Sequence, residues 1–164
     1  MLFWPYLAGA GAPYWNTGAA AAFAGLRHPH DLAVLTRAVL EGIAFENRAM
    51  LRAMGQRHVR VREIRVTGGG STMREWNRIQ SAIYRGPVQM LANPQATLLG
   101  AAIVGAVGSG VLPSFAAAVK QMVRVEETFD PDLKLMKTYE NIRVEYERLG
   151  EAIRRYSQRV QERI

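Results

Sequence analysis

The 164-residue sequence contains no cysteine. Disulfide bonds, thiolate metal ligands and a thiol nucleophile are therefore excluded. Long hydrophobic runs are also missing, because the longest apolar stretch, 96–109, is shorter than the roughly 20 residues that a membrane helix needs. The first residues have no basic flank and no extended apolar run, so we expect no signal peptide. These absences predict a soluble cytoplasmic protein.

The composition is that of a folded domain. Apolar residues make up 49% of the chain and charged residues 21%, and the length fits one domain with a core of its own. Lysine and arginine number 21, against 14 aspartate and glutamate residues. The whole excess of +7 lies between Arg48 and Arg85, where nine arginines accompany two acidic residues.

The placement of these arginines decides what their charge means. Arg48 and Arg52 are four residues apart, as are Arg74 and Arg78, so each pair shares one face if its segment is helical. No aromatic residues alternate with them, as a platform for single-stranded nucleic acid requires. We therefore expect a solvated face or structural ion pairs. Nucleic-acid binding stays an alternative that the sequence does not favour.

Hydrophobic periodicity predicts an α/β chain that is rich in helices and has a small sheet. Residues 1–30 are expected to form an aromatic, glycine-rich loop, 31–130 an α/β core, and 131–164 a long amphipathic helix. Within the first segment, residues 1–26 are predicted to form no regular element and their aromatic side chains to be buried against a surface. The individual helices are predicted over 32–54, around Trp76 to Tyr84, and over 96–107, 115–121 and 135–160, and the strands over 63–67, 88–91 and 123–125.

Several residues mark helix ends or faces. Asp31 and Ser114 stand where N-caps are expected, and Gly55 stands at the expected C-terminal end of the first helix. The helix over 96–107 is apolar nearly all round, which predicts burial, with Gly100 and Gly105 admitting a neighbouring backbone.

The last predicted helix carries an apolar seam with spacings of four and three that includes three tyrosines. Such a seam can form a homodimeric coiled coil. The tyrosines favour docking on the parent domain instead. Gly150 is a weak point midway along this helix.

The turn Gly68-Gly69-Gly70-Ser71 stands between a predicted strand and a predicted helix. Backbone N–H groups and the helix dipole favour an anion at such a place, and glycine removes the Cβ that would keep a ligand from the main chain. The turn lacks the Lys-Ser/Thr ending of a P-loop and the spacing of a dinucleotide fingerprint. Taken alone, a turn without a ligand is an equally good interpretation.

Four blocks in order resemble the FGGY carbohydrate kinases, especially the xylulose kinases. The turn, with Val66-Thr67 before it and Trp76 and Ile79 after it, resembles the adenosine-binding motif of that family. The other blocks are Phe3-Trp4-Pro5-Tyr6-Leu7-Ala8-Gly9 followed by Ala12-Pro13-Tyr14-Trp15-Asn16, then Phe23 to Leu26 with 37–45, and Ala96-Thr97-Leu98-Leu99-Gly100-Ala101-Ala102.

This resemblance implies a partial C-terminal lobe of an actin-like, ribonuclease-H-like ATPase fold. It also implies phosphoryl transfer from Mg-ATP to a sugar hydroxyl, with Mg²⁺ arriving through the nucleotide. Residues near the adenosine and α-phosphate would be Gly68, Gly69, Gly70 and Ser71. Met73 and Asn77 would border the adenine, Gly100 less directly, and Arg74 would supply a nearby cation.

The family's catalytic aspartate, sugar site and first phosphate motif belong to an N-terminal lobe with no counterpart in this sequence. We therefore name no catalytic residue and no metal ligand, and we assign structural roles to Asp31, Glu41 and Glu46. The chain also departs from the family pattern at polar positions. These departures are Ala10 and Gly11 in place of Glu-Arg, Ala20 and Ala21 in place of Arg-Gly, and Val34 in place of a polar residue.

The sequence thus predicts the nucleotide-binding part of a xylulose-kinase-like enzyme that is inactive without its first lobe. A separately encoded N-terminal lobe is a possible partner, and glycerol or another sugar or polyol is the alternative substrate. The alternative function is a non-enzymatic assembly module or pseudokinase remnant, with homodimerisation as one form of assembly.

Overall fold

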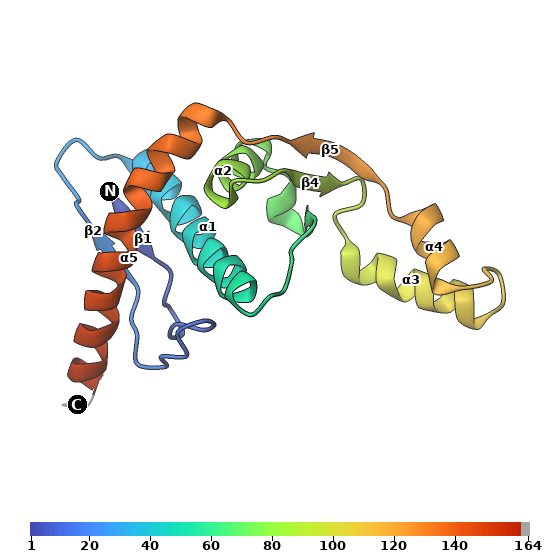
Figure 1. Cartoon of the computed structure of the whole chain (residues 1–164), viewed down its shortest axis with the longest axis horizontal. Helices are drawn as coiled ribbons and strands as arrows, with labels where there is room; N and C mark the ends of the chain where they lie inside the picture. Colours follow the sequence, from blue (N-terminus) through green and yellow to red (C-terminus); the bar gives the residue numbers. More distant parts are fainter. Residues whose placement is uncertain (162–164) are drawn as a thin grey trace. The chain divides into compact units, whose positions relative to one another are not determined.

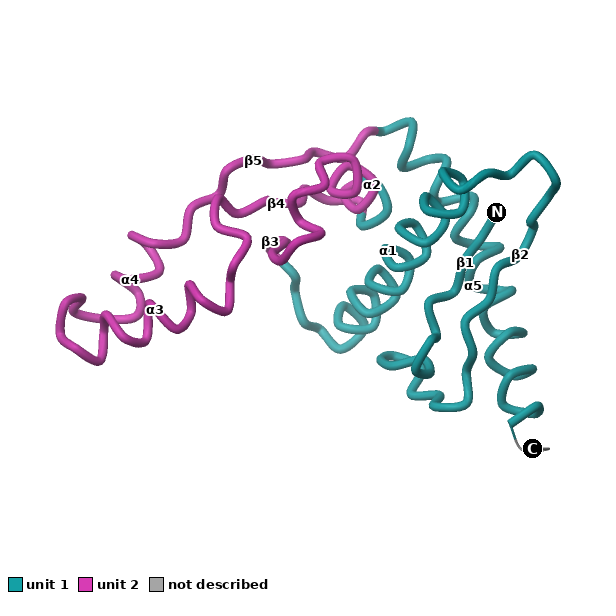
Figure 2. Tube along the Cα trace, turned by 180° about the vertical axis from the view of Figure 1, so that it is seen from behind, with its two compact units in different colours: residues 1–61, 82–84, 133–164 teal, residues 62–81, 85–132 magenta. Residues whose placement is uncertain are grey.

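The computed structural model describes residues 1–161, and Figure 1 shows its helices and strands. They are β1 (Leu2–Trp4), β2 (Ala22–Ala24), α1 (Leu32–Gln56), β3 (Ile64–Val66), the 3-10 helix η1 (Gly69–Thr72), α2 (Arg74–Tyr84), β4 (Val88–Leu91), α3 (Ala96–Gly108), α4 (Phe115–Met122), β5 (Val125–Phe129) and α5 (Leu133–Gln161). The chain divides into two compact units (Figure 2). Unit 1 comprises residues 1–61, 82–84 and 133–161, and unit 2 comprises 62–81 and 85–132.

Aromatic rings fill the centre of unit 1, where α1, α5 and the β1–β2 pair meet. Tyr146 of α5 stacks on Trp4 of β1 and on Phe45 of α1, with ring centroids 5.0 and 4.8 Å apart. The Trp4 indole N–H donates to the Tyr146 backbone carbonyl at 3.3 Å. Tyr139 meets Phe45 edge-on. The tyrosine seam therefore docks within the chain at these two residues, as predicted, whereas Tyr156 is exposed.

The prediction of an irregular loop over 1–26 is wrong at its two ends. Residues 2–4 and 22–24 pair as antiparallel strands, with Phe3 opposite Phe23 and the ring centroids 4.4 Å apart. Strands of three residues are too short to show the alternation by which strands are predicted from sequence. Burial of the aromatics is confirmed for Phe3, Trp4 and Tyr6 but is wrong for Trp15 and Phe23, which are 79% and 45% exposed.

Helix α1 begins as predicted and ends later. The Asp31 carboxylate accepts the Val34 N–H at 3.0 Å, which makes it the N-cap. Gly55 lies inside the helix and does not take a positive φ. The left-handed residue after the helix is His58 instead, with a φ of 61°. The residue with left-handed backbone thus lies three residues beyond the predicted glycine, Gly55.

Two glycines allow close packing between the helices and β1 of unit 1. A Cβ on Gly42 of α1 would collide with the backbone carbonyl oxygen of Phe3. A Cβ on Gly150 of α5 would lie 2.6 Å from the indole nitrogen of Trp4. Gly150 was predicted only as a weak point of its helix. The structure shows that it is buried and lies against the Trp4 indole, so its missing side chain serves packing.

Ion pairs join α1 to α5. Arg48 and Arg52 donate to Glu140 and Glu147, each at 2.7 Å. Arg143, on α5 itself, contacts both glutamates. The pairing confirms the structural interpretation of this part of the arginine-rich window. A shared helix face, as the spacing predicts, is what allows both arginines to reach one partner helix.

Unit 2 is built on a three-stranded sheet of order β3-β4-β5. Strands β3 and β4 are parallel, with Ile64 opposite Val88, and β5 is antiparallel to β4, with Phe129 opposite Val88. Both Val88 and Phe129 are buried. The predicted strands over 63–67 and 88–91 are confirmed, while β5 begins two residues later than predicted. Helix α2 provides the connection between β3 and β4 that a parallel pair requires.

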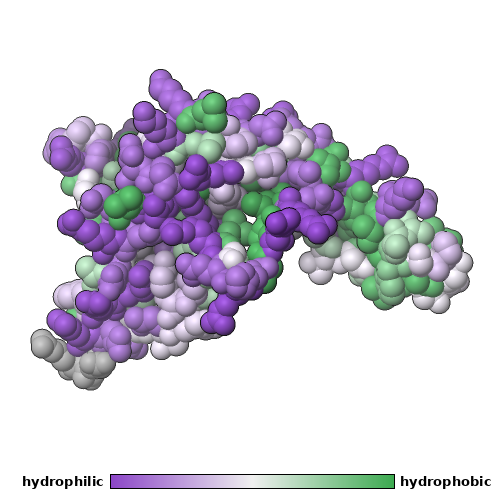
Figure 3. Space-filling model, in the orientation of Figure 1, coloured by the Kyte–Doolittle hydropathy of each residue, from purple (hydrophilic) through white to green (hydrophobic). Residues whose placement is uncertain are grey.

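Helix α3 is exposed, contrary to the prediction that it is buried. Leu98 and Val104 are 67% and 60% exposed, and Ile103 is its buried residue. Helix α4 packs against it, and its Phe115 is 56% exposed. Figure 3 shows this apolar surface in green. An apolar helix is buried only where other elements cover it, and periodicity does not reveal whether the same chain provides them.

The glycines of α3 do not admit a second backbone, which corrects a further prediction. Apart from the neighbouring backbone of α3 itself, no atom of residues 1–161 lies within 4 Å of a Cβ built on Gly100 or Gly105. The next helix follows its prediction more closely, because the Ser114 hydroxyl accepts the Ala117 N–H at 3.2 Å and caps α4. Within residues 1–161, every helix is too short or too polar to span a bilayer.

Gly42 and Gly55 provide a matched test of close packing within α1. We expect Gly42→Ala to destabilise the fold by about 1–3 kcal/mol, since its Cβ meets a backbone atom that cannot rotate away. Gly55→Ala has open space and should stabilise the helix by about 0.5–1 kcal/mol. Thermal unfolding followed by circular dichroism measures both. Equal changes in Tm would contradict the packing role of Gly42.

Glu140 gives a prediction about acid stability. The guanidinium groups of Arg48 and Arg143 lower its pKa from 4.5 to about 2. A carboxyl whose pKa is lowered by folding stabilises the fold at neutral pH, and that contribution is lost as the pH falls from 4.5 towards 2. We expect Glu140→Gln to lower the Tm at pH 7 and the deficit to shrink over that range.

The control for this prediction is Glu151→Gln, which removes an exposed pair with Arg155 on the same helix. It should change the Tm little at any pH, because exposed pairs contribute little to stability. A deficit in Glu140→Gln that stays constant from pH 7 to 2 would refute the coupling between Glu140 and its two arginines.

Candidate functional site

The glycine-rich turn lies at the carboxyl end of β3, in unit 2. Gly68 has a φ of 84°, a conformation that glycine adopts without strain. Its N–H donates to the Pro94 carbonyl at 2.8 Å. Its carbonyl accepts the Ser71 N–H at 3.0 Å and the Ser71 hydroxyl at 2.7 Å. The turn is thereby attached to the loop after β4, the parallel neighbour of β3.

Ser71 and Asn77 fix the backbone of the turn through hydrogen bonds. Ser71 is buried, and its carbonyl accepts the Asn77 side-chain amide N–H at 2.7 Å. Asn77 is fully buried on α2, and its backbone N–H donates to the Met73 carbonyl. The Asn77 Oδ1 atom has no hydrogen-bond partner within residues 1–161. A buried amide oxygen without a partner is available to a ligand or a water molecule.

The three glycines have different surroundings. A Cβ on Gly70 would collide with the Trp76 ring, so this glycine is required by packing. Apart from the adjacent residues of the turn, no atom of the described part of the chain lies within 4 Å of a Cβ on Gly68 or Gly69. The outer side of the turn is therefore open, and its backbone can be approached closely. The first N–H groups of a helix have no partner inside it, and the α2 N-cap residue Met73 provides no side-chain cap.

Arg74 is less available than the sequence suggests. Its guanidinium forms an ion pair with Glu127 of β5 at 2.6 Å. Met73, next to it, is 46% exposed. An anion at the turn must compete with Glu127 for the Arg74 charge.

The structure thus brings together Gly68 to Ser71, Met73 and Asn77, whereas Gly100 lies on exposed α3. Sequence reasoning missed Pro94, whose carbonyl holds Gly68. The sequence contained a partial signal, since Asn93-Pro94 follows shortly after β4, which the structure shows to be the parallel neighbour of β3. Carboxyl ends of adjacent parallel strands meet at one edge of a sheet.

The acidic residues considered in the sequence have structural partners in unit 1. Asp31 caps α1, and Glu41 accepts hydrogen bonds from Arg37 and Tyr139. Glu46 accepts the hydroxyl of Tyr146 at 2.9 Å, and burial raises its pKa. No group of three or more histidines, aspartates and glutamates in residues 1–161 is arranged to hold a metal ion.

Comparison with known proteins identifies the family. Residues 1–109 match the C-terminal domain of the FGGY family of carbohydrate kinases. The chain belongs to this family. A xylulose kinase from Staphylococcus epidermidis is 30% identical over 147 residues, which is 90% of this chain, and a glycerol kinase from Citrifermentans bemidjiense is 35% identical over 80% of it. The matched part spans 30% and 26% of those two kinases, respectively.

Solved structures of FGGY kinases share the fold. The xylulose kinase from Rhodospirillum rubrum superposes with a TM-score of 0.77 and 29% identity, covering 95% of this chain and 31% of that protein. Plasmodium falciparum glycerol kinase with ADP superposes with a TM-score of 0.70 and 24% identity, covering 88% of this chain and 30% of that protein. The predicted fold, part of the C-terminal lobe of an actin-like ATPase, is confirmed.

Trp76 and Gly70 allow a test of the turn's architecture. We expect Gly70→Ala to lower the Tm, because the added methyl group displaces the Trp76 ring. Gly69→Ala, one residue away, has open space and should leave the Tm nearly unchanged. In a background of Trp76→Leu, Gly70→Ala should lower the Tm by less than it does in the parent, because the smaller side chain leaves room for the added methyl group. Thermal unfolding of the parent, Gly70→Ala, Trp76→Leu and the double variant measures this coupling, and strictly additive Tm changes would refute it.

Proposed function

We propose that this chain is the nucleotide-binding part of an ATP-dependent carbohydrate kinase, and that ATP or ADP binds at the turn Gly68 to Ser71. The observation that carries the proposal is that hydrogen bonds of Ser71 and Asn77 hold the backbone of the turn while the sides of Gly68 and Gly69 are open. The glycerol kinase structure with ADP, which shares this fold, supports a nucleotide as the ligand.

The residues fit a nucleotide in two respects. The open sides of Gly68 and Gly69 let a flat or anionic group reach the backbone. The Asn77 Oδ1 atom is a buried acceptor without a partner in residues 1–161. In this proposal Met73 borders the base, Gly70 and Ser71 fix the turn, Arg74 adds a cation when it leaves Glu127, and Gly100 lies further out.

Bound ATP would supply the phosphoryl group, and the residues of this chain would hold and orient its nucleoside. Phosphoryl transfer also needs a metal ion and a group that positions the accepting hydroxyl. The described residues contain no carboxylate cluster that fits Mg²⁺, so we assign the ion to the nucleotide's own phosphates and assign no catalytic residue here. In this proposal the residues of the turn and of α2 position the nucleotide, and groups outside the described residues perform the phosphoryl transfer.

The activity of the whole kinase is a further part of the proposal. The chain spans about 30% of its relatives, so phosphorylation is proposed to require the lobe that carries the acceptor site, on the same or another chain. Xylulose is the substrate proposed first, and glycerol is the alternative, because both kinds of kinase are similar to this chain. The cytoplasm is its proposed location.

A non-enzymatic assembly module is the second candidate function. It is favoured by the exposed apolar residues of α3 and α4, among them Leu98, Val104 and Phe115. The same surface is also compatible with a missing kinase lobe. ADP binding separates the two functions, because an assembly module has no need of the open turn.

Titration with ADP tests the nucleotide proposal directly. We expect saturating ADP to raise the Tm of the chain, since a ligand that binds only the folded state stabilises it. Gly69→Ala should weaken ADP binding by at least about tenfold, which corresponds to about 1.4 kcal/mol, while its Tm without ADP stays near that of the parent.

Gly105→Ala is the matched control, since it adds the same methyl group to open space in α3 of the same unit. Its affinity for ADP should equal that of the parent in isothermal titration calorimetry. An unchanged Tm in saturating ADP would overturn the proposed site. Equal weakening by both substitutions would show that Gly69 has no special part in it.

A further inference from the structure

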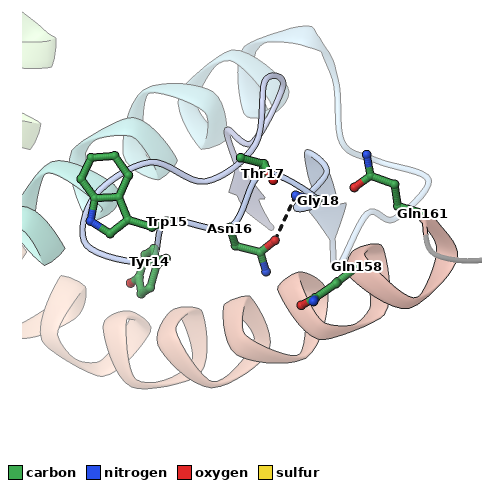
Figure 4. Close-up of a pocket in the computed structure, with 7 residues that line it drawn as sticks. All are labelled: Tyr14, Trp15, Asn16, Thr17, Gly18, Gln158 and Gln161. Atoms are coloured by element: carbon green, nitrogen blue, oxygen red, sulfur yellow. Dashed lines mark hydrogen bonds between the residues drawn. The ribbon is translucent and has the colours of Figure 1, made fainter.

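A pocket lies in unit 1, between the loop that follows the cis Ala12–Pro13 bond and the last turns of α5 (Figure 4). It has a volume of about 500 Å³, within the range of sites for small molecules. Its lining residues are Tyr14, Trp15, Asn16, Thr17, Gly18, Gln158 and Gln161. Neither the nucleotide proposal nor the packing of unit 1 uses this pocket.

The loop side of the pocket is fixed by its own hydrogen bonds. Ala10 and Asn16 exchange two backbone hydrogen bonds, of 2.8 and 2.9 Å. The Asn16 side-chain oxygen accepts the Gly18 N–H at 3.1 Å, as the dashed line in Figure 4 shows. A Cβ on Gly18 would lie 2.6 Å from the side-chain oxygen of Gln161. The same Cβ would lie 3.4 Å from the Gln158 Cα atom, an ordinary contact distance, so the loop lies against α5 at this edge of the pocket.

Trp15 is the most unusual residue of the pocket. Its φ of 50° is in the left-handed region, which a bulky residue rarely adopts. Its side chain is 79% exposed, so the strain is not balanced by burial of the indole. Strained residues cluster at ligand-binding sites. Next to it, the Tyr14 ring is held by the Arg154 guanidinium, 3.7 Å from the ring centroid.

The lining chemistry defines the class of ligand. Two aromatic residues, three residues with side-chain amides and a threonine line the pocket, and none of the seven lining residues is acidic or basic. A charged ligand would find no counter-charge among these seven described residues. A neutral molecule with many hydroxyl groups matches it, since its C–H face can pack on an indole and its hydroxyl groups can pair with amides.

We propose that this pocket binds a neutral sugar or polyol, with Trp15 as the stacking surface and the amides of Asn16 and Gln161 as hydrogen-bonding partners. The proposal rests on unit 1 alone. It stands or falls separately from ADP binding at the turn in unit 2.

Ligand-observed saturation-transfer NMR on the whole chain tests the proposal, with D-xylose, sorbitol and sucrose as probes and D-glucose 6-phosphate as the charged comparison. We expect at least one neutral probe to bind and the phosphorylated sugar to bind no more tightly. Trp15→Gly suits the left-handed backbone and should weaken the neutral probe by at least about tenfold. Phe115→Ala, which removes another exposed aromatic ring, should leave binding unchanged.

Three outcomes would overturn the proposal. They are no binding of any neutral probe at about 100 mM, far above the millimolar range, equal binding by Trp15→Gly and the parent, and tighter binding of the phosphorylated sugar. Self-association in sedimentation that Trp15→Gly abolishes, without sugar binding, would reassign the exposed indole to a contact between copies. ADP titration of Trp15→Gly should match the parent, which separates failure here from failure at the turn.

Discussion

Close approaches that only glycine permits are the constraint on which both units depend. In unit 1, Gly42 lies against the Phe3 carbonyl, and Gly150 lies against the Trp4 indole. In unit 2, Gly70 lies against the Trp76 ring. These contacts set how near a helix comes to a strand or how near a turn comes to the following helix. A larger residue at any of them would separate elements that share a core.

The glycine-rich turn combines this kind of packing with its opposite. Gly70 faces inward against Trp76, whereas Gly68 and Gly69 have open space where a side chain would stand. Ser71 and Asn77 fix the backbone between the two sides. A turn held from one side and accessible from the other is suited to receive a ligand without rearrangement. Three consecutive glycines therefore serve two purposes that the sequence alone does not distinguish.

Local signals predicted the elements well, and non-local contacts account for the errors. Asp31 caps α1 because a side-chain acceptor and an adjacent N–H decide it. The β1–β2 pair was missed, since its partner strands lie on either side of a long loop. The burial of α3 was mispredicted because Leu98 and Val104 would need covering elements that residues 1–161 do not provide. Gly150 was misjudged because its contact, Trp4, lies at the other end of the sequence.

The glycine-rich turn and the pocket of unit 1 also depend on contacts between residues that are distant in the sequence, so sequence reasoning found only part of each. The turn was found from sequence because its residues are consecutive, but the Pro94 carbonyl that anchors it comes from the next loop. The pocket of unit 1 is lined by residues near 15 and by residues near 160, so no continuous sequence motif indicates it. Only its aromatic side was visible, as part of a family block whose aromatics were expected to be buried. Trp15 is the exception, and exposure was needed to single it out.

A polar network connects the core of unit 1 to this pocket. Glu46 accepts the hydroxyl groups of Tyr6 and Tyr146, and Arg154 donates to the Tyr6 hydroxyl at 2.8 Å while covering the Tyr14 ring. Burial raises the pKa of Glu46, and the two hydroxyl donors and the Arg154 charge oppose that rise. The orientation of a ring at the pocket thus depends on a carboxyl group in the core. Because Arg154 is engaged by Tyr6 and Tyr14, its charge supports the wall of the pocket and does not enter the lining.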